Sequence, residues 1–366
     1  MTNGLFRLRW LFCGYALGCF ILLVSGNPAM GLGVLVLSMV VHYCACTRKY
    51  KKIYTRQKKV FNERSHLRTI DFYLRDRRDV AMANPLPEAH RPWGERPIHE
   101  ISPSHYLRKL TVREKIPRCS SPKLALDVGS LSGEISLEFV KKNYRMVLLD
   151  LDIVSLKHAI GITHCSGIIA DMERLPFRED AFDFISMLEV IEHADRPLNV
   201  LKEIGRVCRR GGRLLITTDN RSALQFGELP NPMIVMSKIW SLFDDSVLKY
   251  RSILWMGDDG RRIYPHADFS WQEIRKMLHD AGYQIHTAAS YDFLSGFEQL
   301  VSKFNRHITE GAYAGHALRI ETVLRAIPFV NRLGGHWWLE CSMQNKYGMN
   351  HEPVKFSIGP SEQAVP

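Results

Sequence analysis

Several common features are missing from this sequence of 366 residues. It has no internal repeat and no low-complexity tract, so repeat architectures are not expected. Its eight cysteines show no paired metal-ligand spacing. Four of them lie in or beside the apolar N-terminus, and the others are scattered, as is usual in a reducing compartment. The net charge of +11 is unevenly distributed along the chain, so we do not expect nucleic acid as a partner.

Residues 10–46 contain no aspartate, glutamate, lysine or arginine. The turn signal Ser25-Gly26-Asn27-Pro28 divides this stretch into two apolar segments, 10–24 and 29–46. Each is slightly shorter than the roughly 20 residues with which a helix crosses a bilayer. We therefore expect residues 1–47 to form a closely packed transmembrane hairpin. A re-entrant hairpin is the nearest alternative, whereas a cleaved signal peptide fits poorly because a second apolar segment follows at once.

Acidic residues are absent from 48–59, where seven lysines and arginines follow the hairpin. Such a run is attracted to anionic lipid headgroups. Because Arg7 and Arg9 precede the hairpin, both of its ends are expected on the cytoplasmic side of the membrane. We expect a basic helix and a proline-rich linker over 48–103, a large domain over 104–346, and a disordered tail over 347–366.

The large domain is organised around the stretch LALDVGSLSG, residues 124–133. It reads as a buried strand, 124–128, that ends in a tight turn before a helix. Gly129 and Gly133 have no Cβ and would let a ligand approach the backbone. Asp127 would present its carboxylate to a crevice at the strand end.

Acidic residues also end the next predicted strands. The strands 146–149, 166–170 and 182–188 are followed by Asp150, Asp171 and Glu189, and a fifth strand, 213–218, follows a turn at 209–212. Asp150 lies just over 20 residues beyond the glycine-rich turn, as expected for an acid that accepts hydrogen bonds from ribose hydroxyls. The pattern predicts one cleft lined by carboxylates.

In this order the motifs ALDVGSLSG, LLDLD, ADMERLPFREDAFDFISMLEVIEHADRP and EIGRVCRRGGRLLITT resemble those of class I S-adenosylmethionine-dependent methyltransferases. The similarity is to the methyltransferase type 11 group, which includes UbiE- and UbiG-like enzymes. It is close over 123–218 and looser to about 345. It implies an α/β fold: a Rossmann-like seven-stranded sheet with helices on both faces, which binds S-adenosyl-L-methionine.

The resemblance also implies roles for individual residues. Gly129 and Gly133 would lie against the methionine part of the cofactor, with Glu189 near its amino end. Asp150 would bind the ribose, Asp171 would meet the adenine amino group and Met172 would pack on the ring. Asp127 is counted with this set. The family's middle glycine is replaced by Leu131, which would either crowd the cofactor or point into the core.

Methyl transfer from a sulfonium is a direct displacement, so the enzyme mainly aligns the reactants. An oxygen or nitrogen nucleophile also needs a base, for which Glu192, His193, His266 and Asp268 are candidates. We favour His193 and His266. The tract that holds Glu192 and His193 could equally shape the cleft. No metal is expected, because no further ligand cluster supports one.

The remaining segments are predicted as an apolar region at 221–266, a helix at 270–281, a strand at 283–289, a helical insertion at 296–335 and a last strand at 337–343. The two apolar regions could form a lid or a membrane-dipping surface, or be ordinary core. We expect a membrane-anchored methyltransferase that acts on a lipid, an isoprenoid quinone precursor or a lipid-linked glycan. A non-catalytic membrane scaffold is the alternative. A nicotinamide dehydrogenase is disfavoured by Leu131 and by the later acids.

Overall fold

The computed structural model describes residues 104–224, 267–295 and 297–344, with short pieces between 235 and 265. The predicted hairpin, basic helix, linker and tail lie outside the described residues, and so does His266. Among the helices that are described, none combines the length and hydropathy needed to cross a bilayer.

Seven strands form one sheet in the order β3-β2-β1-β4-β5-β9-β8. They are β1 (Lys123–Val128), β2 (Tyr144–Asp150), β3 (Ser166–Ile169), β4 (Phe182–Leu188), β5 (Cys208–Asp219), β8 (Tyr283–Tyr291) and β9 (His336–Met343). The first five are parallel, and β9 is antiparallel to both of its neighbours. The predicted seven-stranded sheet is confirmed. The antiparallel β9 also separates this fold from the all-parallel dinucleotide-binding sheet.

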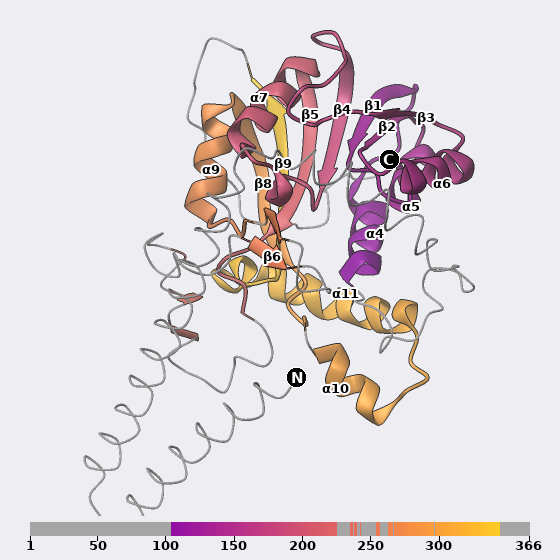
Figure 1. Cartoon of the computed structure of the whole chain (residues 1–366). Coiled ribbons are helices and arrows are strands. Elements are labelled where there is room, and N and C mark those ends of the chain that lie inside the picture. Colours follow the sequence, from indigo (N-terminus) through magenta and orange to yellow (C-terminus); the bar gives the residue numbers. More distant parts are fainter. Residues whose placement is uncertain are drawn as a thin grey trace, which may run out of the picture.

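Helices cover both faces of the sheet (Figure 1). They are α4 (Ser104–Lys115), α5 (Glu134–Val140), α6 (Ile153–Thr163), α7 (Pro197–Val207) and α9 (Trp271–Asp280). Because side chains alternate along a strand, neighbouring strand residues enter different cores. Ile185 packs with α7 and α9, whereas Phe184 packs with α4, α5 and α6.

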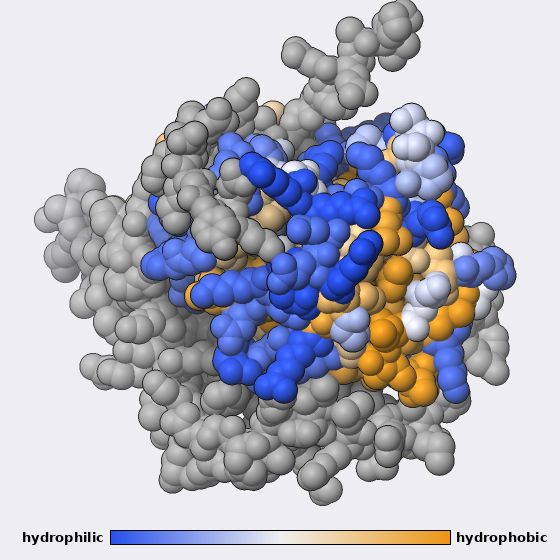
Figure 2. All heavy atoms as spheres, turned by 90° about the horizontal axis from the view of Figure 1, so that it is seen from above, coloured by the Kyte–Doolittle hydropathy of each residue, from blue (hydrophilic) through white to orange (hydrophobic). Residues whose placement is uncertain are grey.

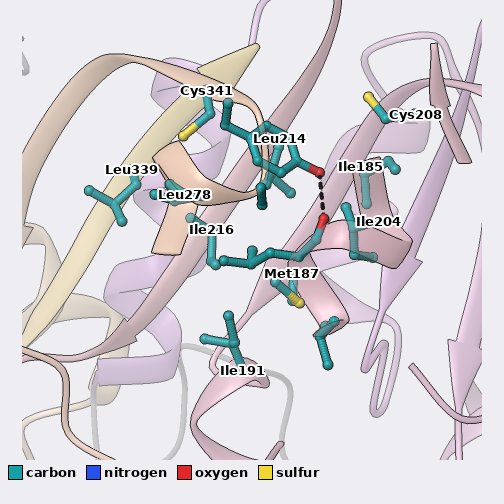
Figure 3. Packing of buried hydrophobic residues seen from close by; sticks show 14 of the residues in the cluster. Ile185, Met187, Ile191, Ile204, Cys208, Leu214, Ile216, Leu278, Leu339 and Cys341 are labelled. Carbon is teal, nitrogen blue, oxygen red and sulfur yellow. Dashed lines mark hydrogen bonds between the residues drawn. The ribbon is translucent and has the colours of Figure 1, made fainter. Parts of the chain in front are cut away.

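The core on the α7 and α9 face combines aliphatic and sulfur-containing side chains with aromatic ones such as Trp271 and Trp337. In the close view, Ile204 of α7 and Leu278 of α9 lie beside strand residues such as Leu214 and Ile216 (Figure 3). α9 begins with a capping box, in which Ser270 accepts from the Glu273 amide and Glu273 accepts from the Ser270 amide. The capping box therefore sets the start of α9, and burial of its apolar side chains in the core stabilises the same helix.

Two details differ from the sequence-based expectation. The predicted turn at 209–212 lies inside β5, where the register with β4 shifts between Phe182 and Phe184 and Gly211 has φ 73°. The glycine pair thus makes a bulge in a longer strand. In the apolar region, β6 (Leu254–Met256) and β7 (Ile263–Pro265) form an unpredicted antiparallel ribbon.

The predicted insertion between the last two strands is helical. It contains α10 (Phe297–Phe304), α11 (Glu310–Ala326) and the short 3-10 helix η3 (Val330–Arg332). In Figure 1 the arrows of β4 and β5 point downward and α10 and α11 lie below the sheet, at its carboxyl edge. Figure 2 shows the molecule from above, on the end opposite to α10 and α11. This end is largely hydrophilic on one side and has a continuous apolar area on the other.

We expect Gly133→Ala to lower the free energy of unfolding by about 2 kcal/mol, because φ is 76° there and the added Cβ would lie 2.6 Å from the Ala159 Cβ. Gly161→Ala is the matched control. That glycine lies within α6 with nothing within 4 Å of an added Cβ, so its replacement should stabilise by about 0.5 kcal/mol. Urea denaturation measures both. Equal effects of the two changes would contradict this account of Gly133.

Candidate active site

A cavity of about 300 Å³ lies at the carboxyl ends of β1, β2, β3 and β4, near the lower end of the size range of small-molecule sites. All but one of the predicted cofactor residues line it, namely Asp127, Gly129, Asp150, Asp171, Met172 and Glu189. His193 lines it as well. The four acids at the ends of four strands therefore meet around one space, as the strand-end pattern predicts.

Gly133 does not line this cavity. It precedes α5, and its missing Cβ allows that helix to pack closely against Ala159 of α6. Gly129 has φ 71°, and a Cβ there would lie 2.4 Å from a methyl group of Val190. The two glycines thus serve close packing at the turn, and Gly129 alone of the pair also borders the cavity.

Asp127 borders the cavity, but its carboxylate is held by the protein. One oxygen accepts from the Ser136 hydroxyl and the other from the Ser186 hydroxyl, the latter at 2.7 Å. Burial raises the pKa of Asp127 to about 6, although both hydroxyls oppose the shift. Its side chain therefore joins α5 to β4, in contrast to the predicted carboxylate that faces the crevice.

Asp150 organises the glycine-rich turn. Its Oδ2 accepts from the Leu131 amide at 2.7 Å, and its Oδ1 accepts from the Asp152 amide at 2.8 Å. Leu131 has φ 44°, is 45% exposed and is among the residues that line the cavity. The residue that replaces the middle glycine thus avoids the core, and its backbone is fixed by the acid of the next strand.

Asp171 and Met172 form the wall of the cavity beyond β3. The Asp171 Oδ1 accepts from the Glu173 amide at 2.9 Å, and Met172 packs on the edge of the hydrophobic core. A carboxylate oxygen has a second lone pair, so the Asp150 and Asp171 side chains retain capacity to accept from a ligand. An apolar thioether beside these acids suits a flat ring with a polar edge.

Glu189 is surrounded by positive and hydroxyl groups from three other elements. Its Oε1 accepts from the Tyr291 hydroxyl at 3.0 Å and lies 3.7 Å from Arg108, and its Oε2 lies 2.8 Å from the His336 Nδ1. Burial raises the pKa of Glu189, but the charges of His336 and Arg108 outweigh it and bring the pKa to about 2. Its backbone has φ 57°, a strained conformation of the kind found at functional sites.

His336 lies at the centre of a cluster of acids. Besides Glu189, its Nδ1 lies 3.0 Å from Asp219, its Nε2 lies 3.6 Å from Asp292, and its ring stacks on Tyr291 at 5.2 Å. The Nδ1 is not aligned with either oxygen as a regular hydrogen bond, so the contact is chiefly between charges. Burial lowers the pKa of His336, but the surrounding negative charge raises it well above the ordinary value.

The same cluster contains a possible set of metal ligands. One ligand atom each from Glu189, Asp219 and His336 lie within 4.8 Å of one another. A metal requires a neutral imidazole, whereas these acids favour the imidazolium.

Of the predicted bases, Glu192 is a structural residue. It is buried, it accepts from the Thr218 hydroxyl at 3.0 Å, and its carbonyl accepts from the Ala267 amide. Burial, together with the charges of Glu189 and Asp219, raises its pKa well above the ordinary value. His193 reaches the cavity with a partly exposed side chain, and its Nε2 lies 3.9 Å from Glu192. The Asp268 carbonyl accepts from Arg221.

Comparisons with known proteins agree with this geometry. Residues 126–216 match a family described as "Methyltransferase domain". The chain carries a class I S-adenosylmethionine-dependent methyltransferase domain. It is an enzyme of the methyltransferase class, and S-adenosyl-L-methionine is its methyl donor.

Relatives of this methyltransferase act in quinone biosynthesis, according to their names. The ubiquinone/menaquinone biosynthesis C-methyltransferase UbiE of Roseobacter denitrificans is 29% identical over 197 residues, which cover 49% of this chain and 73% of the relative. The ubiquinone biosynthesis O-methyltransferase of Hahella chejuensis is 29% identical over 148 residues, which cover 38% and 60%. A methyltransferase structure from Mesorhizobium loti is 11% identical, with a TM-score of 0.42, over 66% of this chain and all of that one.

We expect the methyltransferase variant Leu131→Gly to change the affinity for S-adenosylhomocysteine by less than about threefold, because Leu131 is 45% exposed at the border of the cavity and the backbone contact with Asp150 remains. Isothermal titration calorimetry measures the affinity. A parent chain that fails to bind, with binding restored by glycine, would show that Leu131 blocks the site.

We expect His336→Asn to cost about 2–3 kcal/mol of stability near neutral pH, because it removes a positive charge that lies close to the partly buried carboxylates of Glu189 and Asp219. The difference in free energy of unfolding between the parent and the variant should have its full value just below pH 6.5, the ordinary pKa of histidine. It should vanish as pH rises through the raised pKa of His336. It should also shrink as pH falls from 4.5 towards 2, where Glu189 becomes protonated.

Thermal unfolding across this pH range measures the effect. His158→Asn, at an exposed position of α6, is the control and should follow the parent. A constant difference between the parent and His336→Asn at every pH would show that the ring acts by packing and not by charge.

Proposed function

We propose that the protein transfers the methyl group of S-adenosylmethionine to a lipid-soluble acceptor. We favour an isoprenoid quinone precursor over a membrane lipid or a lipid-linked glycan as that acceptor. The observation that carries the proposal is the cavity bordered by acids from four strand ends, in a chain whose relatives are named for quinone biosynthesis. The long uncharged stretch at 10–46 supports a membrane anchor that keeps the enzyme beside such substrates.

The residues around the cavity fit the donor. Asp150 would accept from the ribose hydroxyls, Asp171 would accept from the adenine amino group, and Met172 would cover the ring. Glu189, kept ionised by His336, would hold the methionine ammonium. Arg108 of α4 lines the same space and is the cation available to the methionine carboxylate.

The donor supplies an activated methyl group, so the chain's own residues have to bind, orient and exclude water. Glu189 supplies a fixed negative charge at the end of β4, on the side of the cavity next to β5. His193 lines that region and is the side chain best placed to take a proton from a hydroxyl acceptor. A carbon acceptor, as the name of the first relative indicates for that protein, would use the same alignment.

The alternative, a membrane scaffold without catalysis, would not need these charges. A scaffold has no reason to keep a partly buried glutamate ionised beside a cavity, since removing a charge from water costs free energy. The arrangement around Glu189 therefore favours an enzyme with a bound cationic ligand.

We expect labelled methyl groups from S-adenosylmethionine to enter the organic phase of membrane extracts treated with the purified chain.

Asp150→Asn should lose at least about tenfold in S-adenosylhomocysteine affinity, because a charge-assisted hydrogen bond is worth roughly 1.5–3 kcal/mol. Asp183→Asn is the control: that acid pairs with Arg209 at the opposite edge of the sheet.

Label that stays in the aqueous phase would count against a lipid-soluble acceptor. Retained affinity in Asp150→Asn would count against the assignment of the ribose site. The two measurements are independent, so a failure of one leaves the other interpretable.

A further inference from the structure

The helical insertion between β8 and β9 exposes large apolar side chains. Phe304 is 85% exposed, Val323 62% and Phe329 59%, and three further exposed side chains are aliphatic. We call these six the α10–α11 surface: Leu300, Phe304, Ile320, Val323, Ile327 and Phe329. They are six of the eleven exposed large hydrophobic residues in the described part of the chain. Such a concentration marks an interaction surface more often than chance exposure.

One side of α11 is apolar along its length. Near the start of the helix this side is covered by α10, and further along it is exposed. Tyr313 and Ile320 are seven residues apart and therefore lie on one side of the helix, and Ile327, the C-cap residue, follows at the same spacing. Tyr313 is buried against α10, where it packs with Phe297 and Val301. Ile320 and Ile327, further along the same side, are exposed. The apolar side of α11 is thus longer than the part that α10 covers.

Most of the exposed charges around this surface are positive. Between residues 297 and 335 the acids are Glu298, which is partly exposed in the first turn of α10, and Glu310 and Glu321, which are both fully buried. Glu321 pairs with Arg325 at 2.9 Å inside the domain. Lys303, Arg306 and Arg319 are exposed. Apart from the partly exposed Glu298, the insertion therefore shows solvent apolar, positively charged or neutral groups.

We propose that the α10–α11 surface docks on an anionic lipid bilayer. Apolar side chains enter the boundary between headgroups and acyl chains, while lysines and arginines meet anionic headgroups. A second copy of this chain is a poorer partner, since it would place like charges face to face. The insertion lies at the carboxyl edge of the sheet (Figure 1), the edge that holds the cavity, so docking brings the active site to the membrane.

The test uses the full-length chain in lipid nanodiscs and two variants that each add one tryptophan, Phe304→Trp and Val323→Trp. Phosphatidylglycerol brominated on its acyl chains quenches tryptophan that reaches the bilayer. The parent, with its seven tryptophans, gives the background. Lys157→Trp, on the exposed face of α6, is the control.

We expect the added fluorescence to fall by about twofold or more in both variants and to be unchanged in the control. Charge reversal of Lys303, Arg306 and Arg319 to glutamate should restore it. The proposal is overturned if the added tryptophans stay bright while the chain is on the disc. It is also overturned if brominated phosphatidylcholine quenches equally, or if soluble acrylamide shows the tryptophans shielded by protein without lipid quenching.

This inference is independent of the acceptor. Methyl transfer to a water-soluble phenol reports on the chemistry, and lipid quenching reports on docking. Quenching without transfer overturns only the proposed reaction, and transfer without quenching overturns only the docking surface.

Discussion

The ionised carboxylate of Glu189 is the group on which the architecture of the site depends. It stands at the end of β4, in a backbone conformation with φ 57°, and it contacts Arg108 of α4, Tyr291 of β8 and His336 of β9. A buried charge is tolerated only when it is paired and hydrogen-bonded. The partners of Glu189 thus draw the first helix of the domain and its last two strands towards the cavity.

The arrangement explains why the site needs more of the chain than the motif region. The family match ends at residue 216, yet Tyr291 and His336 lie well beyond it. A domain trimmed to the matched segment would keep Asp150 and Asp171 and lose the counter-charges of Glu189. The antiparallel β9, which pairs with β5 through Thr218 and Trp337, delivers His336 to the edge where the parallel strands end.

Much of the sheet could be predicted because its signals are local. Short apolar runs that end in an acid identify β2, β3 and β4, and their shared edge predicts that the acids meet. The positions of Arg108 and His336 could not be predicted, because they are 81 and 147 residues from Glu189 and no local pattern marks them. The environment of Asp127 was also hidden, since Ser136 and Ser186 become its partners only through packing. The segment with His266 lies outside the described residues.

The helical insertion leaves the sheet after Tyr291 and returns at His336, and the side chains that flank this gap meet, with Asp292 only 3.6 Å from the His336 ring. The two ends of the insertion are therefore held together by contacts between the end of β8 and the start of β9, independently of the residues between them. The entropic cost of closing a loop grows only with the logarithm of its length. Evolution could lengthen, shorten or reshape this insertion without altering the register of β8 on β9, so the insertion and the catalytic part of the molecule are free to diverge at different rates.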